Sequence, residues 1–181
     1  MRVLILAATL PELAWVTDHE QLAVGIGPVE AGIATAARLV NDPPDAILHV
    51  GIAGARRASG LEIGDVVIGT ESRYSDLLAG VPTLITTCLP DPALLARVAA
   101  LLPNARQLPI ATTARVGGSR DCEVEAMEGF AVLRAAAEAS VPCVELRAIS
   151  NMVEEADRAN WDFPAGLRAV ADAGRVVVSG L

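Results

Sequence analysis

Residues 122–158 read CEVEAMEGFAVLRAAAEASVPCVELRAISNMVEEADR, which predicts a strand, a helix, a second strand and a loop in that order. Residues 124–127 are short and apolar enough to end a strand, and residues 128–139 are rich in Ala, Leu and Glu, which favour helix. Pro142 ends that helix, and residues 143–149 alternate as a strand does. The stretch therefore predicts a β–α–β unit.

This unit also indicates where a ligand site is expected. A strand, a crossover helix and a second strand form parallel neighbours whose carboxyl ends lie at one edge of the sheet. Open α/β sheets bind ligands at that edge. Glu128 follows the first strand and Asn151 follows the second, although the two are far apart in the sequence. We therefore expect both side chains at one site.

The composition predicts a single α/β domain over residues 1–181. A chain of 181 residues can bury a sizeable core, and its 52% of hydrophobic residues are mostly Ala, Val, Leu and Ile, with only 3% aromatic residues. Runs of Val and Ile suit buried strands, and Ala-rich runs suit helices. The net charge of −8 argues against nucleic acid and anionic membranes as partners, because both bind basic surfaces.

The cysteines and the basic residues narrow the chemistry further. Cys88, Cys122 and Cys143 are odd in number and widely spaced, so neither a disulfide framework nor a zinc motif is expected, and a cytoplasmic location fits. All fourteen basic residues are Arg, which excludes a lysine Schiff base and a P-loop lysine. His is scarce as well, and no metal and no cofactor is implied.

The remaining elements alternate between apolar strands and Ala-rich helices. The apolar run at residues 2–8 indicates a first strand rather than a secretory signal or a membrane span. Further strands are expected at residues 21–25, 46–50, 66–69 (continuing less regularly to 74) and 107–112, and helices at 30–40, 91–102 and 161–173. Loops are expected at residues 9–12 and 113–121, strand and loop at 78–89, and a continued helix or an edge strand at 175–181.

Several blocks of the sequence resemble a known family. Residues 124–129, VEAMEG, followed by residues 147–151, RAISN, resemble the nucleoside phosphorylase/nucleosidase family, and within it the futalosine hydrolases of menaquinone biosynthesis. Residues 49–54, HVGIAG, and 61–67, LEIGDVV, are also similar to that family. The resemblance implies a three-layer αβα fold with a central mixed, largely parallel twisted sheet. It further implies an N-glycosyl hydrolase for a small-molecule nucleoside, assembled as a homodimer or larger homo-oligomer. Relatives are usually longer in the region of residues 80–122, which helps to cover the base.

The acids supply the chemistry that such an enzyme needs. An N-glycosidase stabilises an oxocarbenium-like sugar, activates a water and makes the purine a tolerable leaving group. Glu12 stands where nucleosidases of the family carry the Glu that activates water. Glu128 is expected to accept hydrogen bonds from the ribose hydroxyls, and Met127 to pack on the sugar face. The alternatives are structural: Glu12 as a solvated acid that favours a helix dipole, Glu128 as a helix start and Met127 as core.

Asn151 decides which base is expected. Adenine-specific nucleosidases of the family carry Asp at this position. An amide offers its NH₂ to a carbonyl at purine position 6 and its oxygen to a protonated N7, so Asn151 indicates a 6-oxopurine such as hypoxanthine. The resemblance then implies that futalosine and water give hypoxanthine and dehypoxanthine futalosine. The alternative is a loop Asn that satisfies backbone groups.

Small residues after the strand at 46–50 support the same site. Gly54 and the backbone of Ile52 and Ala53 are expected near the sugar or the attacking water, because small residues let the backbone approach a ligand closely. Several relatives have Ser where Ile52 stands, so a side-chain hydrogen bond is lost here. Trp161 matches a tryptophan that follows the RAISN block in the futalosine hydrolases, and its ordinary role is packing.

Hydrolysis is favoured over phosphorolysis. The family's phosphorylases bind phosphate with glycines and two arginines, whereas the first loop here has no Arg and ends in the acid Glu12. Arg147 and Arg158 are expected to form salt bridges with acids such as Glu145 or Asp157. Two alternatives stay open. One is a different enzyme, either a methylthioadenosine/S-adenosylhomocysteine nucleosidase or a purine nucleoside phosphorylase, and the other is a homologue that binds a nucleoside without turnover.

Overall fold

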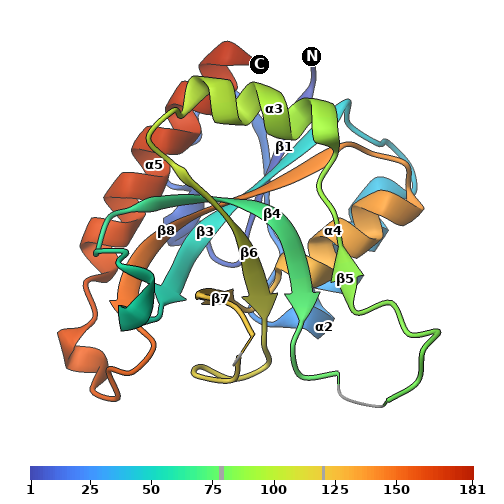
Figure 1. The fold of residues 1–181 in the computed structure, drawn as a ribbon. Helices are drawn as coiled ribbons and strands as arrows, with labels where there is room; N and C mark the ends of the chain where they lie inside the picture. The colour runs from blue at the N-terminus through green and yellow to red at the C-terminus, as the bar shows by residue number, and fades with distance from the viewer. Residues whose placement is uncertain (78–79, 120) are drawn as a thin grey trace.

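The computed structural model describes residues 1–77, 80–119 and 121–181. Its sheet (Figure 1) consists of β1 Val3–Ala7, β2 Glu20–Ala23, β3 Ala46–Ala55, β4 Val66–Tyr74, β5 Thr87–Cys88, β6 Arg106–Thr112, β7 Val124–Ala126 and β8 Cys143–Met152. The helices are α1 Leu10–Leu13, α2 Pro28–Leu39, α3 Pro92–Leu101, α4 Gly129–Glu138 and α5 Phe163–Gly180, with 3₁₀ turns η1 Arg57–Ser59 and η2 Arg158–Asn160. The predictions for residues 78–89 and 113–121 fall partly on residues 78–79 and 120, which lie outside the described residues.

The expected strands and helices are present, and the differences lie mainly at their ends. β3 and β8 continue to Ala55 and Met152, because the two strands stay paired with each other beyond their apolar runs. The tail from Arg175 continues α5 rather than forming an edge strand. The loop expected at residues 9–12 is instead part of the one-turn helix α1.

Aspartates cap the starts of two helices. The side chain of Asp91 accepts a hydrogen bond from the backbone N–H of Leu94 at 2.8 Å and begins α3. Asp162 does the same for the N–H of Ala165 at 2.8 Å and begins α5. Pro164 lies in the first turn of α5, where no N–H partner is needed, so this proline is compatible with the start of the closing helix.

The sheet closes on itself in its central part. β3 pairs with β8 and β7, β8 also pairs with β4, β4 with β6, and β6 with β7, so five strands form a ring. β1 and β2 extend the sheet from β3, and β5 extends it from β4. The expected mixed α/β sheet is confirmed, with both parallel and antiparallel pairs. The simple twisted sheet is not, because the ring leaves its five central strands without a free edge.

The predicted β–α–β unit is wrong in one respect, because β7 and β8 are not parallel neighbours. Both pair with β3, and β3 lies between them: β8 runs parallel to it and β7 antiparallel. Gly54 pairs with Glu125 on one side and with Asn151 on the other. Glu128 and Asn151 therefore meet across the end of β3 and not along a shared edge of adjacent strands.

Helices pack on both sides of the sheet (Figure 1). Successive residues of β1 alternate between two cores: Val3, Ile5 and Ala7 pack with α3 and α5, whereas Leu4 and Leu6 pack with α2 and α4. A third core takes residues from each of the five ring strands, which means that side chains fill the ring: Ala53, Ala55, Val67, Ile110, Val124, Ala126 and Ile149.

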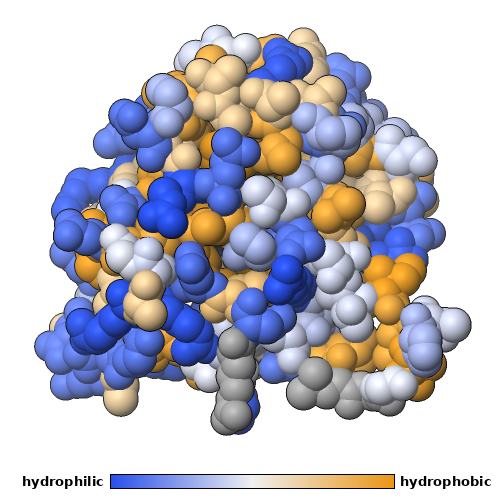
Figure 2. All heavy atoms as spheres, in the orientation of Figure 1, coloured by the Kyte–Doolittle hydropathy of each residue, from blue (hydrophilic) through white to orange (hydrophobic). Residues whose placement is uncertain are grey.

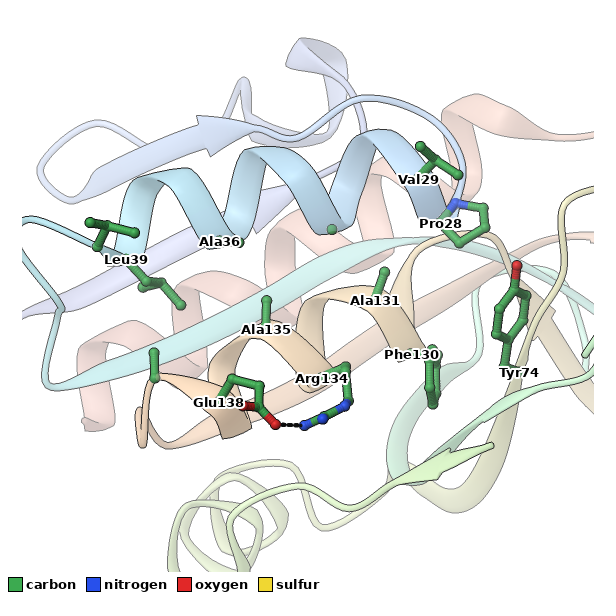
Figure 3. A pocket seen from close by; sticks show the side chains of 13 residues that line it. Pro28, Val29, Ala36, Leu39, Tyr74, Phe130, Ala131, Arg134, Ala135 and Glu138 are labelled. Atoms are coloured by element: carbon green, nitrogen blue, oxygen red, sulfur yellow. Dashed lines mark ion pairs between the residues drawn. The ribbon is translucent and has the colours of Figure 1, made fainter. Parts of the chain in front are cut away.

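The surface mixes hydrophilic and apolar residues, as one face in Figure 2 shows. An exception is α2, which exposes Val29 and Ile33 and is followed by the exposed Val40. Val29 and Val40 border a groove of about 900 Å³ between α2 and α4 (Figure 3). In the described part of the chain, no helix combines the length and the apolar character that crossing a membrane requires.

Candidate active site

One cleft gathers every residue that the sequence singles out for a ligand site. It has a volume of about 830 Å³ and lies where the chain leaves the ends of β1, β3, β7 and β8. The predicted residues that line it are Glu12, Ile52, Ala53, Gly54, Met127, Glu128 and Asn151. The groove between α2 and α4 contains none of them. The cleft is therefore the candidate active site.

Glu12 is held in the cleft by three hydrogen-bond donors. It lies in α1 and is only 4% exposed, so it is not a solvated loop acid. Its Oε2 accepts from the backbone N–H of Thr9 at 2.9 Å and from the Thr9 hydroxyl at 2.7 Å. Its Oε1 accepts from the N–H of Ile52 at 3.1 Å. The bonds to Thr9 form half of a capping box, so the same contacts start α1 and orient the carboxylate.

Glu128 is a second buried carboxylate of the same cleft. It stands between β7 and α4 and is 4% exposed. Its Oε1 accepts from the N–H of Gly27 at 3.1 Å, and its Oε2 accepts from Arg147 Nη2 at 3.3 Å. Burial raises the pKa of Glu128, and although Arg147 and the Gly27 N–H oppose this, the pKa stays above its ordinary value.

Arg147 is a buried cation that contacts Glu128 of the cleft and lies close to Glu12. It is 1% exposed, and its Nε donates to Glu145 Oε1 at 2.9 Å. A Cβ on Gly51 would collide with Arg147 Nη1 and would approach Glu12 Oε1 to 2.8 Å, so both groups lie over this glycine. Burial lowers the pKa of Arg147, but Glu145, Glu128 and Glu12 outweigh it and raise the pKa overall. The guanidinium is therefore a fixed positive charge.

The support of Arg147 comes from the strands on which these residues lie. In the register of β3 with β8, His49 pairs with Glu145 and Gly51 pairs with Arg147. His49 Nε2 lies 3.2 Å from Arg147 Nη2, and burial, with the charge of Arg147, lowers the pKa of His49 well below its ordinary value. A neutral His49 can accept from the guanidinium, so the group has buried partners on several sides.

Asn151 lies at the end of β8 and is 5% exposed. Its Oδ1 accepts from the Ser150 hydroxyl at 3.0 Å, and its Nδ2 makes only a long contact of 3.4 Å with the carbonyl of Met152. A Cβ on Gly54 would lie 3.0 Å from Nδ2, so the absence of a side chain at Gly54 makes room for the amide. The amide NH₂ is the part of Asn151 that remains available to a ligand.

Comparison with known proteins places the chain in a family. The model of the family described as the phosphorylase superfamily matches residues 21–180. A futalosine hydrolase of Streptomyces coelicolor is 36% identical over 180 residues, with 84% of this chain and 75% of that protein covered. The chain belongs to the phosphorylase superfamily. A 5'-methylthioadenosine/S-adenosylhomocysteine nucleosidase of Haemophilus influenzae is 47% identical over 59 residues, which cover 33% of this chain and 25% of that protein.

Solved structures of the superfamily share the fold. The MTA/SAH nucleosidase of Streptococcus pneumoniae, in complex with 8-aminoadenine, has a TM-score of 0.86 at 23% identity and is covered in full, as is this chain. The native futalosine hydrolase of Helicobacter pylori has a TM-score of 0.86 at 17% identity, with 99% of this chain and 97% of that chain covered. Identities this low show a common fold only. Together with the sequence matches, they confirm the family resemblance of the motifs.

The structure links Arg147 to the cleft through its contact with Glu128, a role that the sequence did not assign to it. The expected salt bridge from Arg147 to Glu145 is confirmed, but its contact with Glu128 was missed. The signal was two charged residues at alternate positions of an otherwise apolar strand, since these share one face and are buried together. The expected pair of Arg158 with Asp157 is absent among the described residues, and Arg158 lies over Trp161.

Proposed function

We propose that this protein is a nucleosidase that hydrolyses the N-glycosidic bond of futalosine and releases hypoxanthine, a step of menaquinone biosynthesis. The observation that carries the proposal is the pair of buried carboxylates, Glu12 and Glu128, facing one cleft with Asn151. The 36% identity to a futalosine hydrolase supports the choice of substrate.

The proposed chemistry starts at Glu12. Its carboxylate takes a proton from a water as the water oxygen bonds to C1′ of the sugar and the bond from C1′ to N9 of the purine breaks. The electron pair of that bond stays on the purine, and a second water donates the proton that N7 gains as the base leaves. The backbone N–H of Ile52 and the Thr9 donors fix the Glu12 oxygens, so no side-chain reorientation is needed during the step.

The proposed role of Glu128 is to bind the ribose. Its carboxylate accepts hydrogen bonds from the sugar hydroxyls, while Gly27 and Arg147 hold it in place. Met127 lines the same cleft and offers an adaptable apolar surface to the sugar. Gly54, Ala53 and Ile52 bring the backbone of β3 close to the ligand.

The proposed role of Asn151 is to select the base. Its NH₂ donates to the carbonyl at purine position 6, and a 6-oxopurine therefore fits better than adenine. A methylthioadenosine/S-adenosylhomocysteine nucleosidase is the second candidate, and the match to the Haemophilus influenzae protein favours it. The released base distinguishes the two, since that enzyme would yield adenine.

Water is the proposed nucleophile, and the placement of Arg56 and Arg57 supports it. Arg56 Nε donates to the carbonyl of Cys122 at 3.2 Å, and its Nη2 is bonded to the carbonyl of Ser119. Neither Arg56 nor Arg57 is among the residues that line the cleft. A phosphate would instead approach the carboxylate of Glu12, which repels it.

The test is to incubate the protein with futalosine, and separately with inosine, in buffer without phosphate and to measure the released base by chromatography. We expect hypoxanthine from futalosine, with the other product carrying the sugar. Base release only after phosphate is added would contradict the role of Glu12 and indicate a phosphorylase. Futalosine that raises the melting temperature without any base release at high protein concentration would indicate a binding protein.

We also propose that two copies of the chain associate through α2 and α4. Val29, Ile33 and Val40 are each more than 60% exposed, and the groove beside them is lined mostly by apolar side chains (Figure 3). Light scattering after size exclusion should give a dimer or larger assembly, and Ile33→Glu should shift it towards monomer. A monomeric wild-type protein would contradict this proposal.

The three buried free cysteines support a cytoplasmic location.

A further inference from the structure

Glu145 is a buried acid that the proposed chemistry leaves without a role. Its exposed fraction is 0%, it lies in the apolar strand β8, and it does not line the cleft. Its Oε1 accepts from Arg147 Nε at 2.9 Å, whereas its Oε2 has no hydrogen-bond partner among the residues that the structure describes. A buried acceptor without a donor costs free energy, and an apolar side chain would avoid that cost. Stability alone therefore does not explain an acid at this position.

The bond to Glu145 restricts how the Arg147 guanidinium is oriented. A guanidinium is planar and holds its donors in a rigid fork, so anchoring Nε also limits the directions of Nη1 and Nη2. Nη2 lies 3.3 Å from Glu128 Oε2 and 3.2 Å from His49 Nε2. Nη1 lies over Gly51, where a Cβ would collide with it. Glu145 thus directs the cation towards the carboxylate of Glu128 in the cleft.

This direction matters because several acids are close enough to attract the same cation. Three buried carboxylates surround the one guanidinium: Glu12, Glu128 and Glu145. The Oε1 of Glu12 lies over Gly51, as Nη1 of Arg147 does. Without the bond from Nε to Glu145, the guanidinium would be free to turn towards Glu12 and away from Glu128.

A second contact places Glu145 against the start of α4. A Cβ on Gly129 would overlap both carboxylate oxygens of Glu145, so the acid occupies the space that a side chain would take. Gly129 is the first residue of α4 and follows Glu128 directly. Its φ lies outside the left-handed region, so the space for Glu145, and not the backbone conformation, accounts for the glycine. Glu145 is therefore connected to Glu128 by two routes, through Arg147 and through Gly129.

We propose that Glu145 is a positioning residue for ribose recognition: it holds Arg147 on Glu128 and so fixes the carboxylate that accepts from the sugar hydroxyls. This inference rests on the proposed nucleosidase function and adds to it a residue outside the cleft. An acid that only stabilised the fold would affect all substrates alike. A positioning acid affects most the substrates whose hydroxyls Glu128 binds.

The test compares futalosine with its 2′-deoxy analogue, which lacks one hydroxyl for Glu128. We define discrimination as the ratio of kcat/KM for futalosine to that for the analogue. The glycosidic bond of the 2′-deoxy sugar is intrinsically more labile, but this difference cancels when variants are compared with the wild type. Glu145→Ala releases Nε of Arg147 and should lower discrimination about tenfold, the scale of one charge-assisted hydrogen bond, mainly through KM for futalosine.

Three further variants separate positioning from folding. Glu145→Gln keeps an acceptor for Arg147 Nε and should stay within about threefold of the wild-type discrimination. Gly129→Ala adds a methyl group that displaces the Glu145 carboxylate while every charge stays, so it should also lower discrimination, and it should have no further effect in the Glu145→Ala background. Asp172→Asn removes an exposed acid that pairs with Arg175 outside the cleft and should keep the wild-type ratio.

The outcomes separate this inference from the proposed function. Turnover with wild-type discrimination in both Glu145→Ala and Gly129→Ala would overturn the positioning role and leave the nucleosidase standing. If Glu145→Ala does not fold, Gly129→Ala decides. Without any turnover by the wild-type protein, calorimetric affinities for inosine and 2′-deoxyinosine decide. A preference for inosine that falls in either variant would support the role of Glu145, whereas an unchanged preference, or no binding of either nucleoside, would refute it.

Discussion

The floor and the rim of the cleft use charge in opposite ways. We define the floor as Glu12, Glu128 and the buried Arg147 that contacts Glu128. Each of these residues is at most 4% exposed and is bonded to another of them or to a neighbouring donor. On the rim, Arg115 and Arg158 are exposed and have no charged partner among the described residues. A buried ion pair is costly to break, whereas an exposed cation is nearly free to rearrange. The floor therefore suits fixed chemistry, and the rim suits recognition.

The largest expected effect comes from removing the central cation of the floor. Arg147→Met leaves Glu145 and Glu128 buried without their counter-charge, which should lower the free energy of unfolding by about 3–5 kcal/mol. Arg175→Met is the matched control, because Arg175 pairs with Asp172 on the exposed face of α5, outside the cleft and the groove, and should cost less than about 1 kcal/mol. Urea denaturation measures both variants, and equal losses would remove the distinction between buried and exposed charge.

The next effect concerns Glu12 as the proposed base. Glu12→Gln removes the proton acceptor, so kcat should fall by about 100-fold or more while nucleoside binding persists. Glu30→Gln is the control for the alternative that Glu12 only favours a helix dipole. Glu30 is an exposed acid in the first turn of α2 and outside the cleft, so its substitution should leave kcat unchanged. Single-turnover hydrolysis, with binding measured separately, provides the comparison. Wild-type turnover by Glu12→Gln would remove this residue from the mechanism.

Asn151 lies between floor and rim, and its substitution should change selectivity more than rate. Asn151→Asp replaces the NH₂ donor with an acceptor, so the ratio of kcat/KM for inosine to that for adenosine should fall about tenfold, the scale of one hydrogen bond. The measurement is base release from each nucleoside under identical conditions. A base preference that stays at the wild-type value would contradict the role assigned to the amide.

The smallest expected effect is a shift in the acidic limb of the pH profile of kcat/KM. Burial raises the pKa of Glu128 above its ordinary value of 4.5, and protonation would remove the acceptor for the ribose hydroxyls. The profile of kcat/KM should therefore fall as the pH is lowered through a pKa above 4.5. The folded protein also holds this proton more tightly than the unfolded chain, so the contribution of Glu128 to stability decreases as the pH rises from 4.5 through the raised pKa. An acidic limb at or below pH 4.5 would contradict a raised pKa of Glu128.

The sequence predicted most of the local structure because apolar runs and helix formers act within short segments. The cap of α3 at Asp91 and the start of β1 are examples, since each depends on residues a few positions apart. The one-turn helix α1 was missed, because it has only four residues and the bonds from Thr9 to Glu12 that start it leave no pattern in the sequence that differs from a loop. The pairing of β7 and β8 with β3 was also missed. Strand partners depend on contacts between distant segments, and a local pattern contains no information on them.

For the site, the sequence by itself determined which residue types are available: two acids, one amide and the small residues after the third strand, all in blocks that resemble one family. Only the tertiary structure decided how they are arranged. Closing the five strands into a ring brings Glu128 and Asn151 to one cleft, places Arg147 in contact with Glu128, and leaves Arg158 exposed at the rim. The physical reason is that burial and hydrogen-bond partners belong to the packed chain, and they determine whether a charge is fixed, shifted or available.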